Sequence, residues 1–381
     1  MPQMQKNVSL FSFFSGIGIL DLAFEKNGYN IVFVNEYDFS FMRAYQYARQ
    51  QMHIGTPLYG YHNDSAEKYA KRRGKNILLQ LIEKEHSKGN IVGFIGGPPC
   101  PDFSVAGKNA GAAGKNGRLT KTYFDIICRC KPDFFFFENV KGIVKTEKHR
   151  LFYNQMKRKA EANGYLIDDT IVNALAYGVP QFRERALMVG IRQSLCSRQM
   201  NVLEFDWFRY SLFDTKNILL RNWPVTSPFA VDGELPFSYR GIPKKLTVEY
   251  WFNKNDVAHH ANGNDVFTVK SGIGKISTIR EGDTSGKSFK RLHRWRYSPT
   301  AAYGHNEVHL HPYKERRLSV AEAMAVQSLP KDFVVLSSLT LSQKFKMIGN
   351  GVPFLLAAAI AKTLKETLGE MQEENNEKNC N

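Results

Sequence analysis

The first half of the chain alternates continuous apolar runs with helical patterns, and this alternation limits the fold more than any other feature. The apolar runs lie at 8–14, 31–34, 91–95, 133–137 and 186–191. Strands that are apolar along their whole length are buried on both faces, as in a parallel sheet covered by helices. We therefore expect an α/β domain with a mostly parallel sheet.

The pattern changes after about residue 192. The segment 193–316 is aromatic, basic and irregular, and no clean βαβ unit can be read in it. This change predicts a second domain of different architecture. A last helix is expected at 354–368, followed by a polar, frayed tail.

The expected domain boundaries follow from these changes. Residues 1–192, completed by 340–381, would form one domain, and 193–316 a second. The segment 317–339 between them would be a hinge that carries an organising helix, with Ser319 as its N-cap and Glu322 at the third helical position.

The charge of the chain points to a polyanionic partner. Lys and Arg number 52 against 36 Asp and Glu, a formal net charge of +16. The segment 270–317 holds 11 basic and 4 acidic residues, or +7, and aromatic residues interleave it, as in KRLHRWRY at 290–297. Such a segment suits phosphate contacts and stacking on bases, so nucleic acid is the expected partner. Solubility alone is the competing interpretation of the charge.

Cysteine usage and hydropathy narrow the class of protein further. The odd number of cysteines, five, and their scattered spacing argue against a disulfide framework. Cys128 and Cys130 lack zinc-knuckle spacing, so we expect no metal. We find neither a signal-peptide core nor an apolar run of membrane-spanning length. We expect a soluble, cytoplasmic protein without a membrane partner.

A glycine turn follows the first apolar run. In Phe14-Ser15-Gly16-Ile17-Gly18 the glycines allow a sharp turn and close approach of a ligand. Glu36 ends the next run, where a carboxylate could meet ribose hydroxyls. A tight strand-to-helix turn without any ligand has the same signature.

The loop Gly96-Gly97-Pro98-Pro99-Cys100-Pro101 follows the third apolar run. Open α/β sheets bind ligands at the carboxyl ends of their strands, and a thiol there is placed to act as a nucleophile. The alternative is an inert, buried cysteine, which the flanking prolines disfavour because a core strand would not tolerate them.

Two charged segments accompany the last two apolar runs. Glu138 follows four phenylalanines and is a candidate acid of raised pKa, or else a local cap or ion-pair partner. Arg183 and Arg185 alternate, so they point to one side of an extended segment. One of them could hold a carbonyl or phosphate, and a solvated strand entrance is the alternative.

These motifs follow one another in an order that resembles the DNA (cytosine-5) methyltransferase family of prokaryotic restriction-modification systems. The resemblance covers nearly the whole chain except about 193–290. It implies a Rossmann-like S-adenosylmethionine-dependent methyltransferase domain with a mixed, mostly parallel seven-stranded sheet, plus a smaller, irregular target-recognition domain.

The resemblance also implies a site for S-adenosylmethionine, which would leave as S-adenosylhomocysteine. The family often has Asp two residues before Phe14, where this chain has Ser12, so one helper interaction departs from the pattern. The implied cofactor-binding residues are Phe14, Gly16, Ile17, Gly18, Glu36, Tyr37, Asp64, Ser65, Pro98, Asn350 and Val352.

For catalysis the resemblance implies that Cys100 attacks carbon 6 of a flipped-out cytosine. Glu138 would face nitrogen 3, and Arg185 the exocyclic oxygen with Arg183 nearby. A base inside a duplex is unreachable, so the cytosine must leave the stack.

Double-stranded DNA is the implied partner, and the Gly-rich segment 102–121 resembles the loop that closes over it. A cognate restriction endonuclease would be a functional partner, and the protein is expected to be a monomer. We interpret His305, His309 and His311 as structural or surface residues. The implied DNA-binding residues are Ser104, Arg118, Arg291, Arg294 and Arg296.

Three other functions compete with this interpretation. A tRNA cytosine-5 methyltransferase has the same fold, but the long basic insert favours DNA. A DNA-binding relative without catalysis is disfavoured by the intact Cys100, Glu138 and Arg185. A nicotinamide oxidoreductase would explain the glycine turn and Glu36, but not the cysteine loop.

Overall fold

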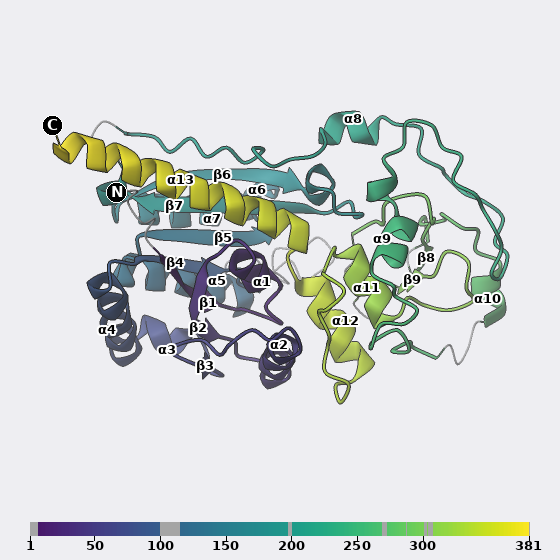
Figure 1. The fold of residues 1–381 in the computed structure, drawn as a ribbon, viewed down its shortest axis with the longest axis horizontal. Coiled ribbons are helices and arrows are strands. Elements are labelled where there is room, and N and C mark those ends of the chain that lie inside the picture. The colour runs from purple at the N-terminus through teal and green to yellow at the C-terminus, as the bar shows by residue number, and fades with distance from the viewer. Residues whose placement is uncertain are drawn as a thin grey trace.

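The computed structural model describes residues 7–99, 115–196, 200–268, 273–286, 288–300, 303 and 308–380. Two lobes lie side by side (Figure 1). The larger lobe contains the main sheet, with the long helix α13 along it, and α11 and α12 lie between the lobes. The boundaries expected from the sequence stay predictions.

The described residues form one seven-stranded sheet in the order β3-β2-β1-β4-β5-β7-β6. β5 and β7 are antiparallel, as are β7 and β6, whereas the other neighbours are parallel. This confirms the expected mixed, mostly parallel sheet. Its strands are β1 (Val8–Phe13), β2 (Asn30–Asn35), β3 (Tyr61–His62), β4 (Ile91–Gly96), β5 (Phe134–Val140), β6 (Tyr165–Asn173) and β7 (Glu184–Arg192).

The helices cover both faces of this sheet and continue into the smaller lobe. They are α1 (Ile19–Glu25), α2 (Phe39–Gln51), α3 (Glu67–Ala70), α4 (Arg72–Ser87), α5 (Lys115–Cys130), α6 (Gly142–Lys145), α7 (Glu147–Glu161), α8 (Thr215–Leu219), α9 (Val248–Lys254), α10 (Ile273–Ser277), α11 (Val320–Val326), α12 (Leu341–Asn350) and α13 (Phe354–Cys380). α13 runs well past its expected end at 368. The expected frayed tail is thus wrong as far as Cys380, because no proline interrupts this segment and Met371 is still buried in the core.

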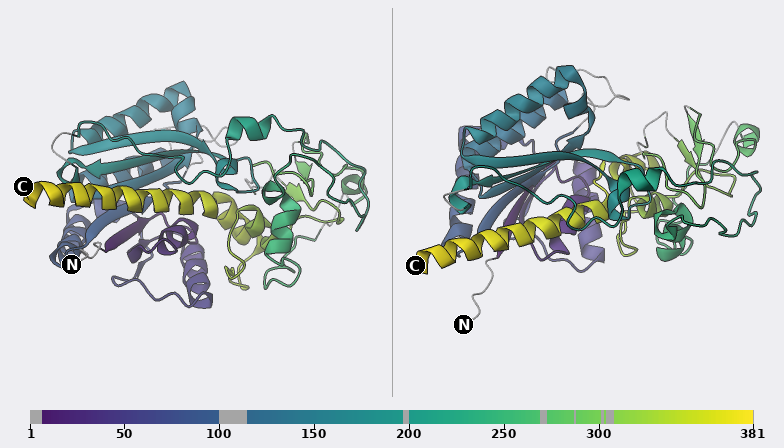
Figure 2. Two further views of the ribbon diagram at one scale, coloured as in Figure 1. Left: turned by 45° about the horizontal axis from the view of Figure 1, so that its top comes forward. Right: turned by 90° about the horizontal axis from the view of Figure 1, so that it is seen from above.

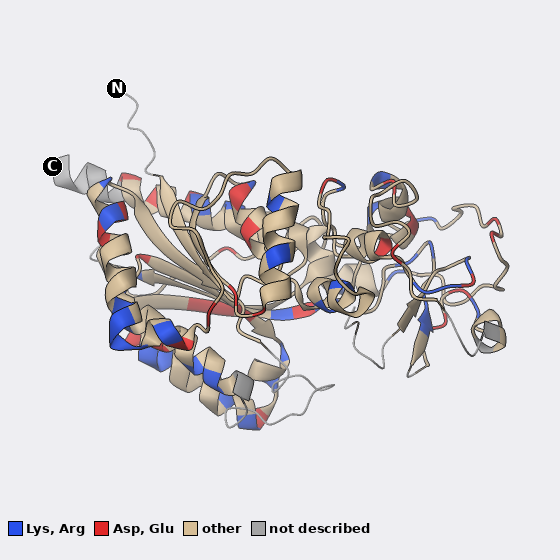
Figure 3. Cartoon of the chain, turned by 90° about the horizontal axis from the view of Figure 1, so that it is seen from below, with Lys and Arg blue, Asp and Glu red and all other residues tan. Residues whose placement is uncertain are grey.

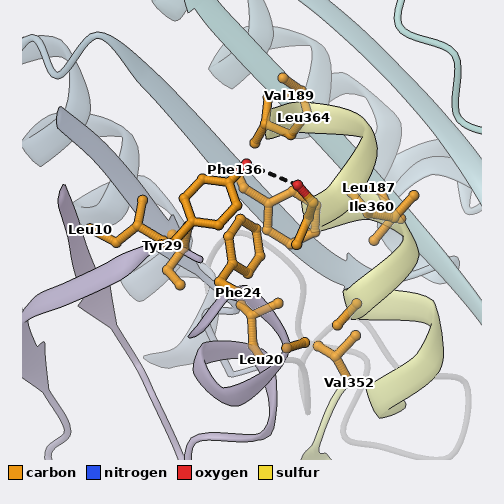
Figure 4. Close-up of a cluster of buried hydrophobic side chains, with 14 of the residues drawn as sticks. Leu10, Leu20, Phe24, Tyr29, Phe136, Leu187, Val189, Val352, Ile360 and Leu364 are labelled. Atoms are coloured by element: carbon orange, nitrogen blue, oxygen red, sulfur yellow. Dashed lines mark hydrogen bonds between the residues drawn. The ribbon is translucent and has the colours of Figure 1, made fainter. Parts of the chain in front are cut away.

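Two apolar layers hold the helices against the sheet. One contains side chains of α1, α2 and α13, and the other contains side chains of α4, α5 and α7. The run 134–137 serves both layers, because alternate residues of a strand point to opposite faces. Phe134 and Phe136 belong to the first layer, and Phe135 and Phe137 to the second. Figure 4 shows the first layer around Phe136, and Figure 2 shows the sheet between α13 and the helices on its other side.

Glycines in the neighbouring strands make room for these aromatic rings. Gly93 pairs with Phe134 and Gly190 with Phe135 across the sheet. A Cβ at either glycine would lie 2.1 Å from the ring of its partner. The phenylalanine run therefore depends on these two glycines.

The smaller lobe contains little regular structure among its described residues. A two-stranded parallel sheet joins β8 (Phe289–Arg291) and β9 (Val308–Leu310), and apolar clusters form around Trp251 and Trp223. The expected helix start is confirmed, because Ser319 and Glu322 form a capping box at the N-terminus of α11. Figure 3 shows basic residues on the loops of this lobe.

One stretch in the described part of the chain, Leu341–Glu373, could cross a membrane by length and composition alone. No apolar run of membrane-spanning length was expected from the sequence. Within this stretch Leu356, Ile360 and Leu364 are fully buried against the sheet, as in the core helix of a globular protein. We therefore assign the α13 part of this stretch to the hydrophobic core.

A buried carboxylate fixes the amino-terminal end of β1 and gives a prediction about acid stability. Glu85 of α4 accepts hydrogen bonds from Ser9, Tyr59 and Asn90 and pairs with Lys88. Burial alone would raise the pKa of Glu85, but these donors outweigh it and lower the pKa to about 2. A depressed folded-state pKa contributes stability above the unfolded value of 4.5, and this contribution is lost as the pH falls toward the folded pKa.

We therefore expect acidification from about pH 5 to about pH 3 to lower the unfolding free energy of the wild type more steeply than that of Glu85→Gln. Urea denaturation at several pH values measures the two slopes. Equal slopes would contradict the assignment.

Candidate active site

The sheet brings the motifs together at one edge. β1, β2, β4 and β5 are parallel, so the segments after their carboxyl ends meet there. These are the glycine turn after β1, Glu36 after β2, Gly97-Pro98 after β4, and Glu138 near the carboxyl end of β5. The antiparallel β7 brings Arg185 to the same edge.

The two glycines of the turn have different tasks. Both have left-handed backbones, with φ 58° at Gly16 and 80° at Gly18. A Cβ at Gly16 would meet no protein atom within 4 Å, whereas one at Gly18 would lie 2.4 Å from the ring of Tyr45. Gly16 therefore faces space that a ligand could fill, and Gly18 is required by packing within the protein.

Glu36 is tied to the glycine turn. Its carboxylate accepts hydrogen bonds from the backbone amides of Gly16, at 2.9 Å, and Asp38, at 2.8 Å. Burial raises the pKa of Glu36, although these amides oppose the rise. Each carboxylate oxygen keeps a lone pair that could accept a further hydroxyl. Tyr37 beside it is 72% exposed.

The remaining residues expected to bind cofactor surround this turn. Phe14 is partly buried with its ring against that of Tyr123, and Ile17 is buried beneath the turn. Ser65 is partly exposed and accepts from the amide of Glu67. Asp64 pairs with Lys68.

Sequence reasoning missed Asn35, which holds the Asp64 segment. The Asn35 amide donates to the backbone carbonyl of Asp64 at 2.8 Å and to its carboxylate at 3.2 Å. A polar residue within the buried strand β2 was the signal that could have identified it.

Glu138 forms a buried ion pair with Arg185 across β5 and β7. The carboxylate lies 2.8 Å from Nε of Arg185, and both side chains are largely buried. Burial raises the pKa of Glu138, while Arg185 and Arg183 oppose that rise. The expected raised pKa is thus confirmed in direction. A Cβ at Gly97 would lie 2.9 Å from the Glu138 carboxylate, so the loop after β4 runs directly against it.

Glu138 and Asn139 lie within β5, whereas the sequence placed them beyond its end. The ladder with β7 extends to the pair Val140–Arg185 and keeps these residues in the strand. Asn139 is buried and donates to the carbonyl of Pro98 at 3.3 Å. This contact ties the ends of β4 and β5 together and gives Asn139 a role that the sequence analysis did not assign.

The predicted nucleophile Cys100 and the predicted phosphate contact Ser104 lie outside the described residues. In the sequence, two prolines separate Cys100 from Gly97, and Gly97 itself lies against the Glu138 carboxylate.

Arg183, predicted as a catalytic residue near the base contact of Arg185, makes its hydrogen bonds within the protein. It is buried, and its guanidinium donates to the carbonyls of Gly349, at 2.8 Å, and Gly351, at 3.0 Å. These bonds fasten the turn between α12 and α13 to the segment before β7. In this turn Asn350 is exposed and Val352 is part of the core. We therefore correct Arg183 from a catalytic to a positioning residue.

Two of the predicted DNA contacts are corrected by the structure. Arg291 is fully buried and donates to the carbonyls of Ile276, Ile279, His311 and Lys314. Arg294 is buried and forms a two-pronged pair with Glu281. Their donors hold the smaller lobe together instead of facing solvent, so we withdraw these two as phosphate contacts.

The other two described candidates keep the exposure that DNA contact needs. Arg296 is partly exposed and lies over the ring of Tyr297. Arg118 is exposed on α5. Within the described ranges, no group of three or more His, Cys, Asp or Glu is arranged to hold a metal ion. His309 and His311 are buried, and His305 lies outside these ranges.

Comparisons with known proteins agree with this geometry. A family model described as C-5 cytosine-specific DNA methylase matches residues 8–366. Type II methyltransferase M.NmeDI of Neisseria meningitidis serogroup C is 49% identical over 379 residues, which are 99% of this chain and 88% of the relative. M.FnuDI, a Type II methyltransferase of Fusobacterium nucleatum, is 30% identical over 380 residues and 96% of each chain.

Solved structures share the fold. Methyltransferase EhMeth of Entamoeba histolytica superposes with a TM-score of 0.60 at 15% identity, over 96% of this chain and 99% of its own. The Dnmt2 methyltransferase of S. pombe gives 0.58 at 11%, over 97% of this chain and all of its own.

The buried pair predicts an asymmetric response to mutation. Arg185→Met should lower the unfolding free energy by about 3–5 kcal/mol, because it leaves Glu138 buried without its partner. Adding Glu138→Gln should recover much of this loss, since a neutral amide costs less to bury. A double-mutant cycle by chemical denaturation measures both effects.

Lys141→Met is the matched control. Lys141, directly after β5, pairs with Glu184 at the start of β7, but half of the Lys141 side chain is exposed. Its loss should therefore cost less than about 1 kcal/mol. No recovery in the double variant would show that Glu138 and Arg185 are energetically independent.

Proposed function

Since the chain belongs to the C-5 cytosine-specific DNA methylase family and is a DNA cytosine-5 methyltransferase, we propose that it acts through a transient bond between Cys100 and carbon 6 of a flipped-out cytosine. The observation that carries this proposal is the buried Glu138–Arg185 pair beside Gly97. A carboxyl group and a guanidinium then lie beside Gly97, which comes three positions before Cys100 in the sequence. We propose that these two groups bind the flipped-out base.

The residues divide the proposed reaction among them. Carbon 5 of cytosine is a poor nucleophile until a thiolate adds to carbon 6. Cys100 forms that bond, and the electron pair of the 5,6 double bond moves to carbon 5. Glu138 gives a proton to nitrogen 3, and Arg185 holds the exocyclic oxygen. Once carbon 5 is methylated, a water acting as base removes its proton, the double bond re-forms and the thiolate leaves.

The pKa of Glu138 suits this role. Burial raises it from 4.5, so the carboxyl group holds a proton at a higher pH than an exposed glutamate would. Arg185 opposes that rise, and its positive charge favours the carboxylate left after the proton has moved. The pair can therefore accommodate both protonation states during the reaction.

The residues at the glycine turn fit S-adenosylmethionine, which supplies an electrophilic methyl group when bound. Gly16 leaves open space at the turn, and the buried Ser15 hydroxyl has no partner among the described residues. Glu36 has lone pairs to spare for ribose hydroxyls, and we propose that the rings of Phe14 and Tyr37 contact the adenine. We propose that Asp64, Ser65, Pro98, Asn350 and Val352 complete the site.

We propose duplex DNA as substrate, with Ser104, Arg118 and Arg296 contacting its backbone. Flipping the cytosine costs roughly a few kcal/mol, which such contacts would offset. The names of the relatives describe Type II methyltransferases. We therefore propose that this protein works as a monomer in the cytoplasm, protecting DNA from a cognate endonuclease.

The nucleophile assignment predicts a separation of chemistry from binding. Cys100→Ala should abolish methylation, because no thiolate can add to carbon 6, and should leave DNA binding within about threefold of the wild type. Bisulfite sequencing of DNA from expressing cells measures methylation and its site, and gel-shift titration measures binding. Residual methylation by this variant would overturn the assignment, and wild-type transfer to tRNA alone would identify the RNA enzyme.

The two glycines predict opposite phenotypes. Gly16→Ala should weaken S-adenosylhomocysteine binding about tenfold or more, because the new methyl group enters the ligand space, and should lower the melting temperature moderately, because alanine is strained at a left-handed backbone position. Gly18→Ala should lower the melting temperature more strongly, because it would overlap Tyr45. Calorimetry and thermal melting measure these effects, with NAD as the control ligand. A larger stability loss at Gly16 would contradict the two assignments.

A further inference from the structure

A buried polar cluster lies directly behind the glycine turn and has no part in the proposed reaction. It consists of Ser12 in β1, Asp21 in α1, and Tyr45 and Arg49 in α2, each at most 1% exposed. Burying a carboxylate and a guanidinium costs free energy unless their hydrogen bonds are satisfied. Hydrogen bonds within the cluster and to the glycine turn offset part of that cost.

Asp21 clamps the two ends of the turn. Ser12 precedes the turn and donates its hydroxyl proton to one oxygen of Asp21 at 2.8 Å. Tyr45 donates to the other oxygen at 2.9 Å. Burial raises the pKa of Asp21, and Arg49 and both hydroxyl donors oppose the rise. The carboxylate thus joins strand β1, helix α1 and helix α2 around the turn.

Arg49 holds the end of the turn where helix α1 begins. Its guanidinium donates to the Gly18 carbonyl at 2.8 Å, lies 4.4 Å from the centre of the Tyr45 ring and pairs with Glu25 at 2.9 Å. The rings and charges packed against Gly18 leave it no room for a side chain. The left-handed conformation of Gly18 is therefore fixed from behind by α2.

We propose that Asp21 is a positioning residue for the cofactor, which sets the turn so that Gly16 and Ser15 face the ligand. The proposal rests on the proposed binding of S-adenosylmethionine at this turn. It also gives Ser12 a role, because its hydroxyl joins strand β1 to the carboxylate that helix α1 supplies. Asp21 acts only through Tyr45, Ser12 and the turn.

The same strand offers a matched control. Ser9, three residues earlier in β1, donates to the buried carboxylate of Glu85. Both pairs join a β1 serine to a helix carboxylate, but the Glu85 pair lies at the amino-terminal end of the strand, away from the turn. A general loss of stability would follow from either substitution, whereas a loss of ligand affinity should follow only from changes at Asp21.

The experiment compares Asp21→Asn, Tyr45→Phe and Glu85→Gln with the wild type by calorimetric titration of S-adenosylhomocysteine, below the melting temperature of the least stable variant. Asp21→Asn should raise the dissociation constant about tenfold, and Tyr45→Phe about threefold, with the stoichiometry still near one. Glu85→Gln should bind like the wild type although it melts at a lower temperature. The KM for S-adenosylmethionine should rise in Asp21→Asn while the KM for DNA stays constant.

A rescue variant tests whether the carboxylate can act from the strand as well as from the helix. Ser12→Asp combined with Asp21→Ser moves the carboxylate to the strand and should return the affinity to within about threefold of the wild type. The proposal is overturned if Asp21→Asn loses binding stoichiometry at unchanged affinity, or if Glu85→Gln weakens binding equally. If the wild type itself binds no S-adenosylhomocysteine, the proposed function fails instead. If the rescue variant does not fold, the comparison of Asp21→Asn and Tyr45→Phe with Glu85→Gln still decides.

Discussion

The antiparallel pairing of β5 with β7 is the constraint on which the site depends. It places Arg185 opposite Val140, and so brings the guanidinium back to Glu138, two residues earlier in β5. Neither charge could be buried alone at a tolerable cost. Because strand hydrogen bonds fix the register, the carboxyl group is presented at the edge of the sheet with little freedom to move. The loop after β4 then packs on it through Gly97, and Asn139 ties that loop to β5.

The segment between α12 and α13 is also held against this edge of the sheet by hydrogen bonds. Arg183, two residues before Arg185, donates to the carbonyls of Gly349 and Gly351. Gln327 at the end of α11 donates to the Ile348 carbonyl. A short stretch of chain at the start of β7 therefore serves two purposes: Arg185 pairs with the buried Glu138 carboxylate, and Arg183 holds the turn between α12 and α13. The two neighbouring arginines therefore have different partners: backbone carbonyls for Arg183 and a carboxylate for Arg185.

The sequence predicted the central strands because they are apolar throughout, and the ordered motifs predicted the family. It missed β6, whose middle residues are partly exposed and include Asp168 and Asp169, so that no apolar run marks the strand. It also could not distinguish buried arginines from exposed ones. Arg291 and Arg294 stand in a basic, aromatic stretch that is typical of DNA contacts, yet carbonyl groups and Glu281 from other segments surround them. Such tertiary partners leave no local signal in the sequence.

Strand β1 shows how polar residues can fix a buried strand without weakening it. Its even-numbered residues face α1 and its odd-numbered residues face α4, because side chains alternate along a strand. Ser12 therefore meets Asp21 on one face, and Ser9 meets Glu85 on the other. Apolar contacts tolerate small shifts along the strand, whereas a hydrogen bond to a buried carboxylate does not. One such bond near each end fixes the position of β1 relative to both helical layers. The position of the glycine turn is fixed as a result, because the turn directly follows β1.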